Sequence, residues 1–182
     1  MGELDWYQAV ELVSPHVVKI STPRGSGTGF LLYMGSNTPI CAIATAAHVI
    51  EQAHYWEEHI RLEHENSGKS AIIRHNQRAI FIDDDRDTAV IMINKDLLPF
   101  PKDTLPLAPQ GKVLKAGNEI GWVGYPAVSH ANLCFFGGRI SAWALQRKAY
   151  LVDGVAINGV SGGPAFNIKE DHVVIIGVVS AY

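Results

Sequence analysis

Short runs of β-branched or other apolar residues recur along the chain, separated by Gly, Asn, Asp and Ser, which interrupt regular structure. In the N-terminal half these runs predict about six strands, the number expected of a small closed barrel. The predicted strands span Val17–Ser21, Gly29–Tyr33, Ile40–Thr45, Ile60–His64, Ser70–Ile82 and Thr88–Ile93. Before them, Leu4–Ser14 places Trp6, Val10 and Val13 at helical spacing and ends at Pro15. We therefore expect a short N-terminal amphipathic helix followed by a β-rich half.

The segment from Asn94 to Gln110 contains four prolines, which cannot donate to a β-ladder and so mark a connection. Further β-type runs follow it, over Glu119–Gly124, Leu133–Trp143, Ala149–Ile157, Gly163–Ile168 and His172–Ser180. Because no helix alternates with these runs, an all-β fold of two antiparallel barrels is favoured over the βαβ class. The predicted division is residues 1–98 for the helix and first barrel, 99–110 for a Pro-rich linker and 111–182 for the second barrel.

The composition narrows the class of protein. Of the 182 residues, 47% are hydrophobic and 18% are charged, which suits a globular, turn-rich chain. The net charge of -3 and the absence of clustered Lys and Arg argue against a nucleic-acid-binding surface. No apolar run in the sequence reaches membrane-spanning length.

The compartment is predicted from the N-terminus and the cysteines. The first residues lack the basic start and apolar core of a secretory signal, although removal of a signal segment would leave the same sequence. The two cysteines, Cys41 and Cys134, fall in separate halves of the chain. A disulfide framework is therefore not expected, and the simplest interpretation is a reducing, cytoplasmic setting.

One stretch suggests nucleophilic chemistry. In Asn158–Phe166 a serine, Ser161, stands among glycines, which allow a tight turn with the backbone close to a ligand. Alone, this pattern fits a nucleophile or an ordinary glycine-rich hairpin equally well. His48 follows an apolar strand, and Asp87 stands at the mouth of another, where a buried carboxylate needs hydrogen bonds. Their order along the chain, His, Asp and then Ser, favours the nucleophile.

Four motifs together resemble the chymotrypsin-like serine proteases, and within them the bacterial HtrA-type branch. They are Gly25–Phe30, Thr45–His48, Asp87–Val90 and Gly159–Pro164. Gly124-Tyr125-Pro126, followed by Gly138–Ala142, also looks like the start of that branch's second barrel. The resemblance runs from about Val17 to the C-terminus. It implies a serine endopeptidase that acts on polypeptides through an acyl-enzyme and needs no cofactor.

The chemistry of such an enzyme assigns a role to each residue. His48 would act as the base that removes the Ser161 proton, and Asp87 would hold the imidazole in the required tautomer. The backbone N–H groups of Gly159 and Ser161 would form the oxyanion hole. By resemblance, Ser180 on the last strand would support Asp87.

Two rival serine hydrolase classes are rejected by chain order. Gly159–Gly163 also satisfies the G-x-S-x-G elbow of α/β-hydrolases, but that fold places its acid and then its histidine after the serine. Only 21 residues follow Ser161, with Asp171 and His172 adjacent on a predicted hairpin. Subtilisin order fails because Asp5 is the only aspartate before His48.

Three features depart from the family pattern. Val160 stands where secreted members carry an aspartate that pairs with a newly cut N-terminal amine, so that activation switch has no partner here. By resemblance, Val155 and its neighbour Ala156 form the base of the specificity pocket, and Tyr182 lies near its mouth. An apolar base offers no counter-charge to Lys or Arg, so cleavage after small or medium aliphatic residues is expected.

The second barrel is also expected to lack its last strand and the usual C-terminal helix. The chain stops soon after the apolar run Val173–Val179, and an unpaired edge of this kind invites pairing with another segment. We expect further domains in a longer protein or, failing that, a partner that closes the barrel. The alternative function is accordingly a protease-fold binding or regulatory module that stays latent until a partner orders it.

Two polar clusters are interpreted without a metal. His54, His59 and His64 lack the tighter spacing of zinc ligands and are assigned to a solvated loop. Asp83-Asp84-Asp85 lacks the alternating ligands of a calcium loop and is assigned to a turn before the Asp87 strand. No metal site is predicted.

Overall fold

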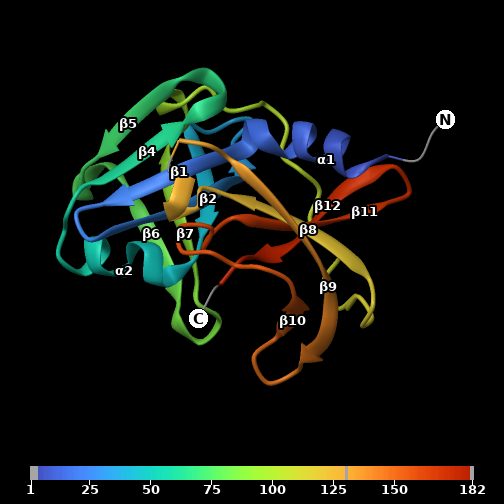
Figure 1. Ribbon diagram of the computed structural model, residues 1–182. Helices are drawn as coiled ribbons and strands as arrows, with labels where there is room; N and C mark the ends of the chain where they lie inside the picture. Colours follow the sequence, from blue (N-terminus) through green and yellow to red (C-terminus); the bar gives the residue numbers. More distant parts are fainter. Residues whose placement is uncertain (1–3, 130, 181–182) are drawn as a thin grey trace.

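A computed structural model describes residues 4–129 and 131–180, which form two antiparallel sheets and two short α-helices (Figure 1). The first sheet has seven strands in the order β5-β4-β1-β2-β3-β7-β6. Its strands are β1 (Val17–Thr22), β2 (Gly25–Met34), β3 (Ile40–Thr45), β4 (Ile60–His64), β5 (Lys69–Ile73), β6 (Ala79–Asp83) and β7 (Thr88–Asn94). Alternate residues of these strands fill one apolar core, which confirms the predicted β-rich first half.

The second sheet has five strands in the order β10-β9-β8-β11-β12. Its strands are β8 (Glu119–Gly124), β9 (Cys134–Ala144), β10 (Ala149–Asp153), β11 (Pro164–Lys169) and β12 (His172–Val178). The proline-rich segment before β8 forms no strand, but Leu107 makes one parallel bridge to Ile175 of β12. The predicted all-β fold with two antiparallel halves is confirmed.

The structure corrects three local predictions. Ser70–Ile82 is not one strand, because a short 3-10 turn at His75–Gln77 separates β5 from β6. The first sheet therefore has seven strands instead of six. The residues after Thr45 form a helix, α2 (Ala47–Tyr55), which the sequence analysis did not predict.

The N-terminal helix α1 (Trp6–Val13) begins at a capping box made by Asp5 and Gln8, which bond each other's backbone N–H groups. Although α1 precedes the first sheet, its apolar face packs on the second sheet. The Trp6 ring lies 5.6 Å from the Phe135 ring and 6.0 Å from the Phe166 ring, measured between centroids. Helix α1 therefore links the two halves of the chain. The division into two domains at residues 99–110 stays a prediction.

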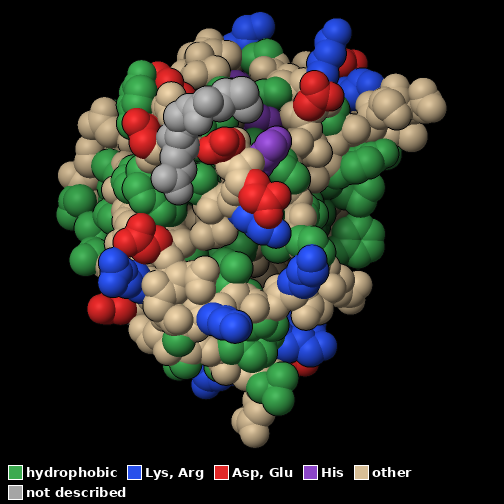
Figure 2. Space-filling model, turned by 90° about the vertical axis from the view of Figure 1, so that its right-hand side faces the viewer, with side chains coloured by type: hydrophobic (Ala, Val, Ile, Leu, Met, Phe, Trp, Pro, Cys, Tyr) green, Lys and Arg blue, Asp and Glu red, His purple; other side chains and the backbone are tan. Residues whose placement is uncertain are grey.

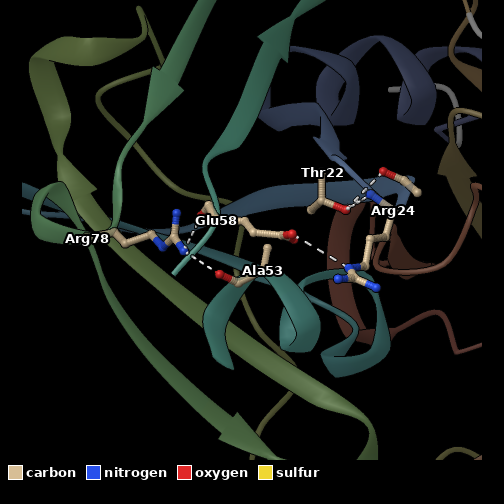
Figure 3. Close-up of polar contacts among 6 residues, drawn as sticks. Thr22, Arg24, Ala53, Glu58 and Arg78 are labelled. Atoms are coloured by element: carbon tan, nitrogen blue, oxygen red, sulfur yellow. Dashed lines mark hydrogen bonds and ion pairs between the residues drawn. The ribbon is translucent and has the colours of Figure 1, made fainter. Parts of the chain in front are cut away.

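The far end of α2 is anchored by one half-buried arginine (Figure 3). The Arg78 guanidinium donates to the carbonyl oxygens of Ala53 at 2.9 Å, Glu58 at 2.7 Å and Ile73 at 3.0 Å. Burial lowers its pKa, but guanidinium stays protonated in proteins. The Glu58 carboxylate in turn lies 3.7 Å from Arg24 Nε, in the β1–β2 turn. Arg78 therefore joins the C-terminal turn of α2 to the end of β5.

Two further findings concern the surface. On the face shown in Figure 2, basic and acidic side chains are interspersed with apolar ones, without a broad basic area among the residues described. None of the helices in residues 4–129 and 131–180 combines the length and hydrophobicity that a membrane span requires.

Candidate active site

The first residue of the candidate site, His48, lies in the first turn of α2. The position before this helix is Ala46, whose side chain cannot cap the exposed backbone N–H groups. Asp87 supplies the cap instead: its Oδ1 accepts from His48 N at 2.9 Å, and its carbonyl accepts from Ala47 N at 3.1 Å. The side chain of Asp87 thus fixes the start of the helix that carries His48.

The same carboxylate binds the imidazole. Asp87 Oδ2 lies 2.7 Å from His48 Nδ1 and accepts from Ser180 Oγ at 2.5 Å. Asp87 has φ 49°, a left-handed conformation that Asp tolerates better than most residues. Only 7% of Asp87 is exposed.

The electrostatic environment keeps this carboxylate ionised. Burial raises the pKa of Asp87 and is the largest single influence. Hydrogen bonds from Ser180, the His48 backbone and the His48 ring, together with the charge of His48, lower it. The net result is an Asp87 pKa below its ordinary value, because the carboxylate accepts three hydrogen bonds.

Ser161 lies between β10 and β11, in a loop that is pressed against the first sheet. Gly162 has φ 90°, and a Cβ there would lie 2.0 Å from Thr28 O and 2.3 Å from Thr45 Oγ1. Only glycine fits this position, because added atoms would overlap the backbone of β2. Thr28 N donates to Ser161 O at 2.8 Å, and Gly162 N donates to Val179 O at 2.7 Å. These contacts bring Ser161, which is 5% exposed, against β2, the middle strand of the first sheet.

Two peptide groups next to Ser161 are hydrogen-bonded through their carbonyl oxygens but not, among the described residues, through their N–H groups. Asn158 O accepts from Ala127 N at 2.6 Å, and Val160 O accepts from Gly163 N at 3.0 Å. Since the described peptide bonds are trans, the N–H of the same peptide group points away from its carbonyl. The N–H groups of Gly159 and Ser161 therefore point away from these partners, and neither donates a hydrogen bond within the described part of the chain.

Val160 is fully buried between these two N–H groups. It belongs to an apolar cluster with Ile120, Trp122 and Ile140. A Cβ on Gly124 would lie 2.9 Å from Val160 Cα and Cγ1, so the fit is close. Apolar packing thus holds this position of the loop, where the sequence analysis noted a missing aspartate.

One expected contact is absent in this structure. Within residues 4–129 and 131–180, no hydrogen bond joins Ser161 Oγ to His48 Nε2. Such bonds are often long in ligand-free enzymes and shorten when substrate binds. His48 and Asp87 are thus in direct contact, while the backbone of Ser161 is bonded to β2.

The predicted specificity residues are less enclosed. Val155 follows β10 and is 61% exposed, and Ala156 is exposed as well. Tyr182 lies outside the described residues. The structure does not enclose Val155 as a pocket base would be enclosed, so these three assignments stay predictions. Ser180 lies two residues beyond the end of β12, and so not on the last strand as expected.

The histidine-rich stretch is structural in part. His54 lies in α2, and His64 is buried at the end of β4, so a solvated loop was the wrong assignment for both. His64 Nε2 lies 2.8 Å from Pro15 O, and Nδ1 lies 2.9 Å from Ser67 Oγ. Across the described chain, no group of three or more His, Cys, Asp or Glu side chains is placed to hold a metal ion.

Thr28 is the site residue that the sequence analysis left without a role. It belongs to the Gly25–Phe30 motif and is fully buried. Its hydroxyl donates to Gly159 O at 2.8 Å and accepts from Tyr125 N at 3.0 Å. The sequence feature that could have pointed to Thr28 is its place between two glycines, Gly27 and Gly29, in a predicted motif.

Comparisons with known proteins were made over the whole chain. A family model described as a trypsin-like peptidase domain matches residues 27–176. The solved structure of Deg5 aligns with a TM-score of 0.74 at 21% identity, covering 98% of this chain and 87% of Deg5. A serine endoprotease from Yersinia pestis aligns with a TM-score of 0.68 at 22% identity, covering 92% of this chain and 55% of that one.

A third similar structure is the Rv3671c protease of M. tuberculosis in an inactive form. It aligns with a TM-score of 0.63 at 20% identity, covering 100% of this chain and 93% of that chain. No curated protein sequence matches significantly. At these identities the structures show a shared fold, and the family model, which matches most of the chain, shows the family. This chain therefore belongs to the trypsin-like serine peptidases, the family that its sequence motifs resemble.

Proposed function

We propose that this protein is an endopeptidase in which Ser161 is the nucleophile, His48 the general base and Asp87 the residue that orients His48. The observation that carries the proposal is the 2.7 Å contact between Asp87 Oδ2 and His48 Nδ1. An ionised carboxylate accepts a hydrogen bond from Nδ1–H, which leaves Nε2 as the free acceptor for a serine hydroxyl. We place the chain in the HtrA-type branch on the strength of its four motifs.

The reaction proceeds in two steps through an acyl-enzyme. His48 Nε2 takes the Ser161 proton as Oγ bonds to the substrate carbonyl carbon, and it then gives that proton to the leaving amine as the C–N bond breaks. Water repeats the sequence: His48 removes a water proton, the hydroxide bonds to the acyl carbon, and Ser161 leaves with the proton returned. No cofactor takes part in this scheme.

Charge that develops on the carbonyl oxygen requires donors set in place beforehand. The N–H groups of Gly159 and Ser161 suit this role because their peptide carbonyls are bonded on the opposite side. Gly159 has φ 95°, and a Cβ there would lie 2.4 Å from Tyr125 O. A glycine at this position therefore lets the loop take the conformation that frees its N–H.

For the substrate, we propose polypeptides with a small or medium aliphatic residue before the cleaved bond. Val155 and Ala156 present apolar groups without a counter-charge for Lys or Arg, and Tyr182 would lie near the mouth. A peptide-library profile dominated by Lys or Arg would contradict this preference.

The residue before Ser161 limits how the activity could be switched on. It is Val160, which has no carboxylate to pair with a new N-terminal amine. We propose that full-length protein needs no N-terminal cleavage. Activity is modulated instead by a partner or further domain, which acts on a two-part catalytic unit divided at residues 99–110.

For the compartment, we propose a cytoplasmic setting, because the cysteines Cys41 and Cys134 are both free.

Fluorophosphonate labelling tests the proposal. The wild-type protein is expected to label at Ser161, Ser161→Ala not at all, and His48→Ala far more slowly. Circular dichroism of each variant shows whether it is folded. Folded wild-type protein that neither labels nor cleaves casein would overturn the endopeptidase assignment and favour the latent binding module.

A further inference from the structure

We infer that Thr28, on β2 of the first sheet, is a positioning residue for the oxyanion site formed by the second half of the chain. Its hydroxyl sets the orientation of the Gly159–Val160 peptide group, and thereby the directions of the Gly159 and Ser161 N–H donors on either side. The inference rests on the proposed function and extends it to a residue that touches no substrate.

The first step concerns how the four peptide groups of the loop are held. Thr28 bonds two of them: its Oγ1 donates to Gly159 O at 2.8 Å, and its N donates to Ser161 O at 2.8 Å. The other two carbonyls, of Asn158 and Val160, are bonded by Ala127 N and Gly163 N. Thr28 thus holds every second peptide group, and the two free N–H groups belong to the groups between.

The second step concerns the capacity of the hydroxyl. A threonine hydroxyl offers one donor and two acceptor lone pairs. Here the single proton goes to Gly159 O, and a lone pair accepts from Tyr125 N at 3.0 Å. The hydroxyl therefore bridges the Ser161 loop to Tyr125–Ala127, the segment that also bonds Asn158 O. Both contacts are buried, so water cannot replace them without opening the site.

The third step concerns why the loop needs this bond. Gly159 has φ 95°, and glycine has the widest choice of backbone conformations. Gly159 can therefore change conformation at less cost than another residue, although Val160 N still donates to Ile157 O at 3.1 Å from the other side of the same peptide group. Without the hydroxyl, Gly159 O would be a buried, unpaired acceptor, which favours rotation of its peptide toward another donor. Such a rotation would turn the neighbouring N–H groups away from the substrate oxygen.

The contacts of Thr28 with its own sheet support a rigid mount. Thr45 Oγ1 on β3 donates to Thr28 O at 2.7 Å, and Thr28 pairs with Lys19 on β1. The residue is thus held from both neighbouring strands while it holds the loop. Thr28 therefore links the loop that carries Ser161 to the half of the chain that carries His48 and Asp87.

The test compares Thr28→Val, which keeps the shape but removes the hydroxyl, with Thr28→Ser, which keeps the hydroxyl. Ile60→Val on β4 is the control, because it trims a fully buried side chain of the first sheet and Ile60 is not part of the loop. For each folded protein, kcat and KM for a peptide substrate are measured across pH. Affinities are measured for a peptide aldehyde, which forms an oxyanion, and for the matching peptide acid.

Thr28→Val is expected to lower kcat by about 10- to 100-fold. This decrease is no larger than the one that removal of an oxyanion donor itself causes, which is about 100-fold or more. KM and the pH profile stay within about twofold of wild type, since His48 and Asp87 are untouched. Aldehyde affinity falls with kcat, while affinity for the peptide acid is kept. Thr28→Ser restores most of kcat, and Ile60→Val behaves as wild type. A kcat for Thr28→Val within twofold of Thr28→Ser would overturn the inference.

A readout independent of activity separates this inference from the proposed function. In protein labelled with ¹⁵N-glycine and ¹⁵N-serine, the amide resonances of Gly159 and Ser161 are compared between the variants. Both should move in Thr28→Val and return in Thr28→Ser, whether or not the wild type cleaves peptides. Unchanged amide resonances in Thr28→Val would refute the positioning role. If the fluorophosphonate probe failed to react with Ser161, only the catalytic assignment would be refuted.

Discussion

Asp87 holds His48 at two points, since Oδ1 accepts the His48 backbone N–H at 2.9 Å and Oδ2 lies 2.7 Å from the ring Nδ1. One carboxylate therefore caps the helix that carries the histidine and sets the ring on that helix. Substitution of Asp87 would disturb both the start of α2 and the imidazole, so its effect on activity has a structural part.

Ser180→Ala offers a cleaner probe of the proposed site. The change removes one hydrogen bond to Asp87 Oδ2 but leaves both bonds to His48. A hydrogen bond to a charged group contributes about 1.5–3 kcal/mol, so we expect kcat to fall by about 10- to 100-fold with KM nearly unchanged. Steady-state kinetics on a chromogenic peptide measure this. Ser141→Ala, at an exposed position of β9, is the control and should match wild type.

The lowered pKa of Asp87 predicts how stability depends on pH. In the folded protein the pKa lies below the ordinary 3.8, so the unfolded chain takes up the proton at a higher pH. The stabilisation is present above about pH 4 and is lost as the pH falls through the folded pKa. Urea unfolding between pH 2 and 6 should show a steeper loss in wild type than in Asp87→Asn. Equal slopes would contradict the shift.

Gly162→Ala should abolish activity by displacing the nucleophile loop. The new Cβ would lie 2.0 Å from Thr28 O, and φ 90° is unfavourable for alanine. We expect no fluorophosphonate labelling and a fall in stability of about 2 kcal/mol or more. Gly177→Ala is the matched control, because nothing lies within 4 Å of its added Cβ. Normal labelling of Gly162→Ala would show that the loop is not held as described.

Arg78→Met should destabilise the first sheet without changing the chemistry of the site. The substitution leaves the partly buried carbonyls of Ala53, Glu58 and Ile73 without the Arg78 donor, and each such loss costs at most about 1–3 kcal/mol before relaxation. We expect a net loss of about 2–4 kcal/mol in urea unfolding. Arg147→Met, at an exposed position, should stay within about 0.5 kcal/mol of wild type.

Much of the fold could be predicted because strand patterns and prolines act locally. Ile40–Thr45 and Ile60–His64 have the predicted boundaries, and Pro99 to Pro109 contain no strand. Helix α2 was missed because its cap is not in the local sequence: Ala46 is a poor cap, and Asp87 caps the helix from the distant turn before β7. A single-sequence pattern carries no trace of such a contact.

The candidate site divides in the same way. His48, Asp87 and Ser161 could be named because each sits in a local motif. The role of Thr28 depends on hydrogen bonds to residues more than ninety positions away, which only the fold reveals. The buried state of His64 was missed for the same reason, since its partner Pro15 lies on a distant segment.

The packing of α1 on the second sheet also sets an order of events during synthesis. Trp6 is synthesised 160 residues before its ring partner Phe166. At 5–20 residues per second this interval is roughly 8–32 s, during which the apolar face of α1 has no native surface to cover it. The helix can therefore dock fully only after β9 and β11, which carry Phe135 and Phe166, have been made. Contact of Trp6 with Phe166 therefore marks the point at which β11 is in place.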